Sequence, residues 1–275
     1  MLNDDPSLNK SALLERMMDL ARQKLVFHNR IDQPSLHKDI ARTAVLDVLI
    51  TIEYDPRWQP ANDFQKEMVA SHMRTAFSVP YHRSYVFSGY PSEPFIAEAA
   101  LRQMFLYNTV IQGNWSIAGI LQNNVQGGLI DLGQKGEVVM RLLLRKAYMD
   151  TIIAEQGPKK TNFSKGCNFL QFLKALFAEG FYSLILECQP ENNVVSPGKL
   201  ADAFEHAVVR FTHFAKAADE SAMTTRGMAM SFLRGAAIIG CTNQKMVDIA
   251  IPILLNSSDR IQEASMSAFL IQVKW

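Results

Sequence analysis

The chain has 275 residues, of which 48% are hydrophobic and 20% are charged. This composition is typical of a folded globular protein and excludes an intrinsically disordered one. The formal net charge of +1 excludes a strong overall field that attracts nucleic acid, so any such contact must be local.

The cysteines and the N-terminal segment bear on the cellular compartment. Cys167, Cys188 and Cys241 are widely spaced and odd in number, which fits neither a zinc motif nor a disulfide framework. The N-terminal segment MLNDDPSLNK is polar and acidic, unlike a signal peptide, and no apolar run has the length of a membrane span. We therefore expect an intracellular protein, cytoplasmic or nuclear, without a membrane partner.

The first part of the chain predicts a helical domain. Apolar residues recur there at helical spacing, and polar or proline-containing turns separate the segments. We expect helices over residues 11–29, 35–52, 62–77 and 92–111. Short connections make antiparallel packing the default arrangement for such helices.

Residues 79–94, VPYHRSYVFSGYPSEP, interrupt this helical pattern with three prolines, three tyrosines, a histidine and an arginine. Tyrosine and arginine are enriched at recognition surfaces, and aromatic side chains with arginine also stack on unpaired bases. The alternative is an ordered loop whose aromatic side chains cover the helical core. This segment is our first choice in the N-terminal half for contact with a partner.

The middle of the chain contains the expected domain boundary. Residues 112–136 are rich in Gly and Asn and predict loops with one short helical turn, whereas residues 136–154 predict a strong helix. Gly157 and Pro158 then stop the helix in a polar stretch. We expect a helical domain over residues 1–157 and an α/β domain over residues 158–275.

The C-terminal part mixes helix and strand patterns, so we expect a predominantly helical α+β protein. Residues 168–179 and 199–207 predict helices, residues 181–188 fit either a helix or a strand, and residues 208–214 alternate like a strand. Thr224 or Thr225 caps a further helix, which Gly235 ends. Three strands are expected to follow, over residues 236–241, 246–255 and 266–275.

Polar residues interrupt the last two of these strands. Asp248 lies in an otherwise apolar run, and Gln272 and Lys274 lie near the end of the final run. Residues two apart on a strand share a face, so Gln272 and Lys274 point the same way. If the two strands pair, the Asp248 side chain approaches both of them.

A helix, a strand, a strand with Asp and a strand that ends in Gln-x-Lys resemble the core of the PD-(D/E)XK nuclease superfamily, in its variant with Gln in the final motif. The resemblance implies a partial αβββ core that is incomplete at its C-terminus. It also implies that Asp248 binds a divalent metal, usually Mg²⁺, that Gln272 is a second oxygen ligand, and that Lys274 orients the attacking water. Such a protein is a metal-dependent nuclease that hydrolyses phosphodiester bonds, with DNA as the expected partner through a local basic surface.

The first acidic residue of the nuclease pattern is open. Arg226 stands in the first turn of the leading helix, so the acid is Glu220, Glu137 or absent. His213 either reaches the Asp248 site or is a packed histidine.

A second interpretation keeps the fold without the catalysis. The chain is then an inactive nuclease-fold or helical module that acts as a binding protein or effector, through protein or nucleic-acid contacts, with Asp248 and Lys274 as a structural ion pair. Stretches such as GYPSEPFIAEAA also resemble long fungal proteins, which implies that the protein continues past Trp275. The oligomeric state is left open.

Overall fold

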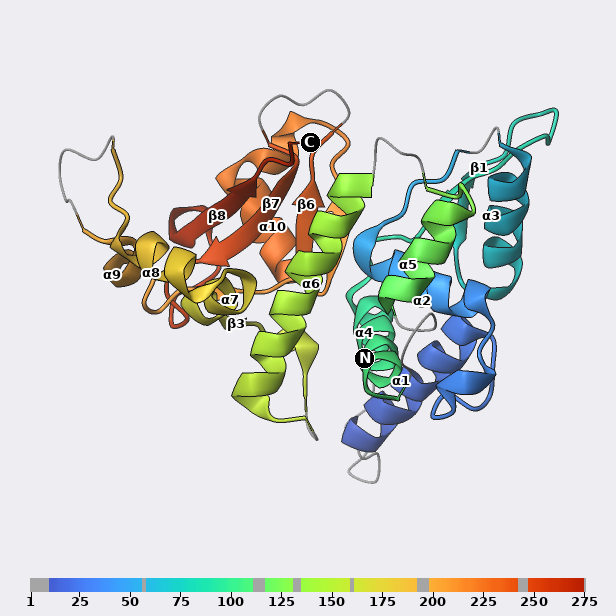
Figure 1. Cartoon of the computed structure of the whole chain (residues 1–275), viewed down its shortest axis with the longest axis horizontal. Coiled ribbons are helices and arrows are strands. Elements are labelled where there is room, and N and C mark those ends of the chain that lie inside the picture. The colour runs from blue at the N-terminus through green and yellow to red at the C-terminus, as the bar shows by residue number, and fades with distance from the viewer. Residues whose placement is uncertain are drawn as a thin grey trace. The chain divides into compact units, whose positions relative to one another are not determined.

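The computed structural model describes residues 10–55, 58–110, 117–130, 135–158, 161–191, 198–241 and 247–274. The protein is mixed α+β and rich in helix, as the sequence predicts (Figure 1). It divides into two compact units, residues 1–132 and residues 133–275. This division falls before the expected boundary at residue 157, because the helix that ends near that boundary packs with elements of the second unit.

The first unit is organised around one helix that is buried on nearly all sides. Its elements are α1 (Lys10–Val26), α2 (Asp39–Ile50), α3 (Gln59–Ser71), β1 (Thr75–Ser78), β2 (Phe87–Gly89), α4 (Pro94–Val110) and α5 (Ile117–Gln126). Every residue of α2 from Ile40 to Ile50 is buried, and α1, α3, α4 and α5 contact it. A helix that is apolar around most of its circumference requires such coverage.

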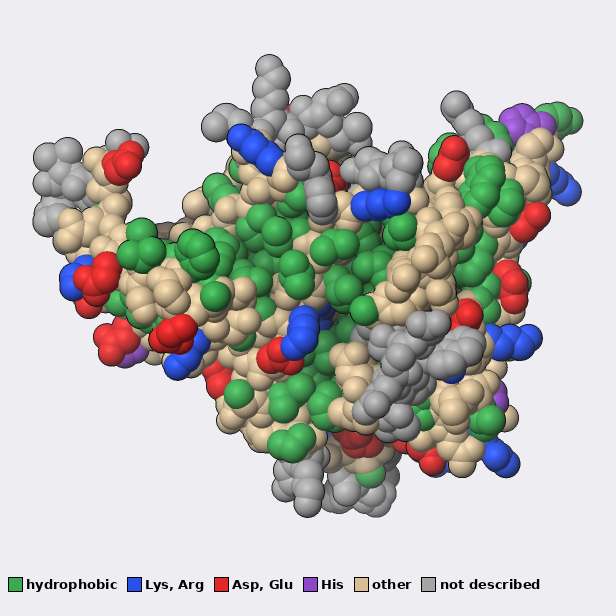
Figure 2. All heavy atoms as spheres, viewed as in Figure 1, with side chains coloured by type: hydrophobic (Ala, Val, Ile, Leu, Met, Phe, Trp, Pro, Cys, Tyr) green, Lys and Arg blue, Asp and Glu red, His purple; other side chains and the backbone are tan. Residues whose placement is uncertain are grey.

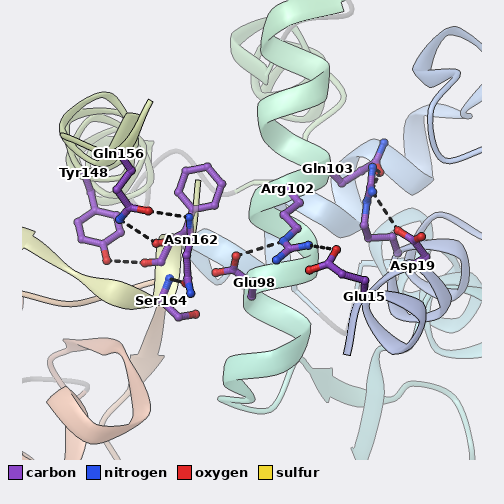
Figure 3. Close-up of polar contacts among 11 residues, drawn as sticks. Glu15, Asp19, Glu98, Arg102, Gln103, Tyr148, Gln156, Asn162 and Ser164 are labelled. Carbon is purple, nitrogen blue, oxygen red and sulfur yellow. Dashed lines mark hydrogen bonds and ion pairs between the residues drawn. The ribbon is translucent and has the colours of Figure 1, made fainter. Parts of the chain in front are cut away.

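Polar contacts join α1 to α4 within this unit. The Arg102 guanidinium on α4 pairs with Glu98, one turn earlier, at 3.2 Å and with Glu15 on α1 at 2.8 Å (Figure 3). The Arg22 guanidinium on α1 donates two hydrogen bonds to the Gln103 side-chain oxygen, at 3.0 and 3.1 Å. These bonds fix the register of the two helices.

A buried ion pair lies between α2 and the start of β1. The side chains of Asp47 and Arg74 are each 2% exposed and form a salt bridge. Asp47 also accepts a hydrogen bond from the Ile52 N–H at 2.7 Å, while the Arg74 guanidinium lies over the rings of Tyr54 and Tyr90, at 5.0 and 5.6 Å. Buried charges are retained at low cost only when they are paired and hydrogen-bonded in this way.

The helix expected over residues 62–77 ends early, and its last residues form a strand instead. α3 ends at Ser71, and Met73 has a positive φ of 61°, so the chain reverses direction there. Thr75–Ser78 then pairs in an antiparallel hairpin with Phe87–Gly89, which lies inside residues 79–94, the segment that the sequence marks as a loop. Helical spacing of Phe77 with earlier residues hid this turn, because a non-glycine residue with positive φ has no strong sequence signal.

The second unit combines helices with a curled mixed sheet. Its elements are α6 (Lys135–Gln156), β3 (Cys167–Asn168), α7 (Phe169–Leu176), α8 (Glu179–Glu187), α9 (Leu200–Ala203), β4 (Val208–Val209), β5 (His213–Lys216), the 3-10 helix η5 (Glu220–Met223), α10 (Thr225–Arg234), β6 (Ala236–Ile239), β7 (Ile249–Leu254), the 3-10 helix η6 (Glu263–Ser265) and β8 (Met266–Ile271). α10 and the three strands after it confirm the order helix, strand, strand, strand that the sequence predicts.

β7 is the central strand of this sheet. One side of β7 pairs along its whole length with β8, and the other side pairs with β6 near its start and with β4 near its end, all antiparallel. β3 lies beyond β4, and β5 lies beyond β6 and runs parallel to it. The chain crosses from β5 to β6 through η5 and α10, which is the connection that a parallel pair needs.

Both faces of the sheet carry apolar side chains. On one face, Phe232 and Met228 of α10 pack in one cluster with Ile238, Ala250 and Met266 of the strands. The second face is aromatic, with ring contacts at 6.0 Å between Phe169 and Phe269, 6.5 Å between Phe172 and Phe269, and 5.8 Å between Phe172 and Phe211. Because neighbouring residues of a strand point to opposite faces, β8 contributes Met266 to the first cluster and Phe269 to the second.

α6 and the segment after it are joined by hydrogen bonds inside the second unit. The Tyr148 hydroxyl donates to the Phe163 carbonyl oxygen at 2.6 Å, and the Gln156 amide exchanges bonds with the Asn162 backbone at 2.9 and 3.2 Å (Figure 3). Arg145 on the same helix is buried and donates to the Phe211 carbonyl oxygen at 2.8 Å. These bonds attach α6 to the strand region.

Several expected elements differ in extent. Residues 208–214 form two short strands rather than one, since Val208–Val209 pairs with β3 and β7 whereas His213–Lys216 pairs with β6. Residues 117–126 form a helix, α5, in a region expected to be mostly loops, and residues 181–188 belong largely to the helix α8. None of the described helices is long and apolar enough to span a membrane.

Candidate functional site

The pairing of β7 with β8 brings the three predicted residues to one corner of the sheet. Ile249, the first residue of β7, pairs with Ile271, the last residue of β8. Asp248 directly precedes the first of these residues, and Gln272 and Lys274 closely follow the second. Ile249 and Ile271 form the last pair of this ladder, so Asp248 and Gln272 both lie just past its end, at the same corner of the sheet.

The Asp248 carboxylate has a backbone partner that the sequence does not reveal. Its Oδ2 accepts a hydrogen bond from the Val273 N–H at 2.6 Å. The Asp248 N–H donates to the Ile271 carbonyl oxygen at 2.9 Å, and the Gly240 N–H donates to the Asp248 carbonyl oxygen at 2.8 Å. Asp248 therefore joins the ends of β6 and β8, and its carboxylate continues the ladder past the last paired residue.

The other two predicted residues are exposed beyond the end of β8. β8 ends at Ile271, so Gln272, Val273 and Lys274 lie outside the strand that was expected to reach residue 275. Within the described residues, neither the Gln272 nor the Lys274 side chain forms a hydrogen bond or ion pair with Asp248. The expected structural ion pair between Asp248 and Lys274 is therefore not formed.

The oxygen donors at this corner suit a divalent cation only in part. Asp248 supplies one carboxylate, whose Oδ1 carries no protein hydrogen bond in the described residues, and Gln272 can supply an amide oxygen. Mg²⁺ in proteins is often held by one or two carboxylates while water and substrate phosphate fill the remaining positions. No cluster of three His, Cys, Asp or Glu side chains with metal-site spacing occurs among the described residues. Among the predicted residues, only Asp248 and Gln272 bring oxygen donors to this corner, so solvent and substrate would have to fill most of the positions around a Mg²⁺ ion.

Neither Glu220 nor Glu137, the two candidates for the first acid, forms a metal-site cluster with Asp248 among the described residues. Glu220 begins η5 and is exposed, and Glu137 lies in the first turn of α6, a helix that packs against α7 and β3. Because α10 has no acid in its first turn, the predicted metal ligands are reduced to Asp248, just before β7, and Gln272, just after β8.

His213 is a packed histidine. It lies on β5, is buried, and is separated from β7 by β6. Its Nδ1 lies 3.0 Å from the Thr212 hydroxyl. Burial lowers the pKa of His213 to about 3, and the charges of Arg145 and Arg234 lower the pKa in the same direction. His213 therefore stays neutral and takes no part in a site at Asp248.

A cavity of about 520 Å³ lies elsewhere in the second unit, between the end of α8 and α9. Cys188, Pro190, Leu200 and Phe204 contribute to its apolar lining. None of the predicted site residues lines this cavity, so it does not belong to the corner at Asp248.

A family model described as a domain of unknown function (DUF8736) matches residues 32–275. The chain belongs to this family. The DUF8736 match includes the β1–β2 hairpin and the whole of the second unit, whereas α1 precedes it. No curated protein and no solved structure matches the chain.

Proposed function

We propose that this DUF8736 protein is a metal-dependent nuclease-like hydrolase of the cell interior that cleaves phosphodiester bonds, with DNA as substrate and Mg²⁺ as cofactor. The observation that supports the proposal is the register of β7 and β8. Pairing of Ile249 with Ile271 leaves a carboxylate-bearing residue, an amide-bearing residue and a lysine at the same corner of the sheet. An αβββ arrangement with α10 against the sheet also agrees with the PD-(D/E)XK resemblance.

Each residue has a distinct chemical role in this proposal. The Asp248 carboxylate and the Gln272 amide oxygen would hold the cation, and a bound Mg²⁺ would polarise the phosphoryl group. The exposed Lys274 ammonium is free to approach a substrate, where it would orient the attacking water and stabilise the charge that develops on the phosphate. The bond from the Val273 N–H holds the Asp248 carboxylate in place for this task.

A second candidate function is a binding module without catalysis. It is favoured by the same 2.6 Å bond, because a carboxylate that caps the end of β8 has a structural reason to be present. In this case Asp248 is a strand clamp, and Gln272 and Lys274 are surface residues.

Two conservative variants separate these functions. Asp248→Asn keeps an oxygen that can accept the Val273 N–H but removes the negative charge, and Lys274→Met keeps the side-chain length but removes the ammonium. Asp259→Asn, in the exposed connection between β7 and β8, and Lys174→Met, on the exposed side of α7, are the matched controls. Cleavage of end-labelled DNA is measured with Mg²⁺ and with EDTA, and thermal unfolding is measured for each variant.

The nuclease proposal expects Mg²⁺-dependent cleavage that falls by about 10² to 10³-fold in Asp248→Asn and Lys274→Met, which is typical of a lost charge at a reacting phosphate. Both controls should keep the wild-type rate. Cleavage that persists in both site variants contradicts the assignment. Absence of DNA cleavage by the wild-type protein also contradicts it. If Asp248 is instead a strand clamp in a binding module, Asp248→Ala should cost about 1 kcal/mol of stability and Asp248→Asn should cost less.

A further inference from the structure

The β1–β2 hairpin of the first unit has an inner polar face and an outer aromatic face. The Ser88 hydroxyl on β2 points inward, where it accepts from the Arg74 Nε at 2.9 Å and donates to Gln65 Oε1 at 3.0 Å. Because side chains alternate along a strand, the neighbours of Ser88, Phe87 and Gly89, lie on the outer face. The Phe77 ring covers Gly89, since a Cβ atom on this glycine would lie 2.7 Å from the Phe77 Cε2.

Aromatic rings continue along this outer face to the tip of the hairpin. The ring centroids of Phe87 and Tyr85 are 5.3 Å apart, and those of Tyr85 and His82 are 5.2 Å apart, both in edge-to-face geometry. Phe77 is 62% exposed, Phe87 is 46% exposed, and Tyr81 at the tip is fully exposed. We call Phe77, Tyr81, His82, Tyr85 and Phe87 the aromatic face. Figure 2 shows hydrophobic, histidine and basic side chains together at the projecting end of this hairpin.

The exposure of the aromatic face does not come from a loosely held loop. The Asn62 side chain on α3 donates to the Ser84 carbonyl oxygen at 2.7 Å and accepts from the Val86 N–H at 3.2 Å. Arg74 donates to the Ser88 carbonyl oxygen at 2.8 Å, and the Pro80 carbonyl oxygen accepts from the Arg83 N–H at 2.9 Å. The rings are therefore held outward on an anchored backbone, which lowers the entropy cost of binding a partner.

The charge on this segment has one sign. Residues 68–92 contain no Asp or Glu, and Arg74 is neutralised by Asp47 in the interior. Arg83 at the tip is exposed and has no salt bridge among the described residues. A ligand that meets the aromatic face thus meets ring surfaces together with one uncompensated guanidinium.

We propose that the aromatic face, with Arg83, binds single-stranded nucleic acid. Unpaired bases stack on exposed aromatic rings whatever their sequence, and a nearby guanidinium pairs with the phosphate backbone or stacks on a base. A paired duplex keeps its bases covered, so it has no ring surface to offer to Phe77 or Phe87. The inference concerns the first unit and does not depend on catalysis at Asp248.

The test measures fluorescence anisotropy of a labelled 20-nucleotide oligo-dT and of a 20-base-pair duplex with the full-length protein, in EDTA so that no cleavage occurs. Phe77→Ala, Phe87→Ala and Arg83→Gln each remove one part of the surface. Phe87→Trp keeps a stacking ring. Phe181→Ala is the matched control, because Phe181 on α8 is 67% exposed but lies in the other unit.

The proposal expects tighter binding of oligo-dT than of the duplex, weakened by salt. Each alanine variant should lose about 5 to 100-fold in affinity, which corresponds to one lost stacking contact, while Phe87→Trp and Phe181→Ala bind like the wild type. Because the assay contains EDTA and reads binding alone, its outcome is independent of the cleavage test at Asp248. The proposal is overturned if the protein does not bind oligo-dT, if it binds the duplex equally well, or if Phe181→Ala loses as much affinity as the face variants. It is also overturned if the aromatic face binds a protein partner but no oligonucleotide.

Discussion

Removal of Arg74 should destabilise the first unit far more than removal of an exposed charge. The Arg74→Met variant leaves the Asp47 carboxylate buried without its counterion, although the Ile52 N–H at 2.7 Å still donates to it. The variant also removes two hydrogen bonds to Ser88, at 2.9 and 2.8 Å. Breaking one side of a buried pair costs about 3–5 kcal/mol, because the remaining charge has lost its compensation.

A double-mutant cycle tests whether this cost belongs to the pair. Asp47→Asn keeps an oxygen for the Ile52 N–H, so the double variant Asp47→Asn with Arg74→Met removes both charges and retains that bond. We expect the double variant to be more stable than the sum of the single effects predicts, by about 1–3 kcal/mol. Lys146→Met is the control, because the Lys146–Asp150 pair on α6 is exposed and contributes about 0.5 kcal/mol or less.

Urea unfolding followed by circular dichroism gives the free energies, and hydrogen exchange of peptides from α2 assigns the effect to the first unit. The assignment is needed because two compact units can unfold separately. A cost below about 1 kcal/mol for Arg74→Met would show that the pair is not a major source of stability. Single effects that simply add would show that the two charges do not interact.

Three further predictions concern the second unit. The pKa of His213 is about 3 in the folded protein, below its unfolded value of about 6.5, so the stability from neutral His213 is complete above pH 6.5. That stability falls by about 1.4 kcal/mol per pH unit as the pH drops below 6.5, because the unfolded state then binds a proton that the folded state excludes. In His213→Leu, the urea midpoint should therefore change less between pH 7.5 and pH 5.5 than in the wild type. An unchanged pH dependence of the midpoint would contradict this. Gly227→Ala should lower the melting temperature by several degrees because its Cβ would lie 2.2 Å from the Ala222 carbonyl oxygen, whereas Gly180→Ala meets no atom within 4 Å and should stabilise α8 by up to about 1 kcal/mol. Thr224→Ala should cost about 1 kcal/mol in urea unfolding because it removes the 3.1 Å cap bond to the Gly227 N–H, and a cost near zero would mean that this cap is dispensable.

The sequence predicts long elements with clear end signals better than short paired ones. α10 begins after the Thr224 cap and ends at Gly235, which has a left-handed φ of 62°, and both signals are local. The two strands β4 and β5 are short, and their separation depends on which distant strands they meet. No pattern within residues 208–214 carries that tertiary information, so a single strand was the natural expectation.

The candidate site was predictable in its location but not in its contacts. Strand periodicity and pairing suffice to bring Asp248 and Gln272 to the same end of β7 and β8. The hydrogen bond from the Val273 N–H to Asp248 depends on where β8 stops, which the apolar run MSAFLIQVKW does not mark. The buried pair of Asp47 and Arg74 was also missed, because each residue alone looks like an ordinary charge on a helix.

The helix α8 illustrates what weak attachment implies for a short apolar segment. It has nine residues, none of which is buried, so neither its length nor its packing gives it much stability. A chymotrypsin-like protease should therefore cut first near Phe181 and Leu184, which are exposed and become flexible whenever the helix frays. Phe172, fully buried on the adjoining α7, should resist until the unit itself unfolds.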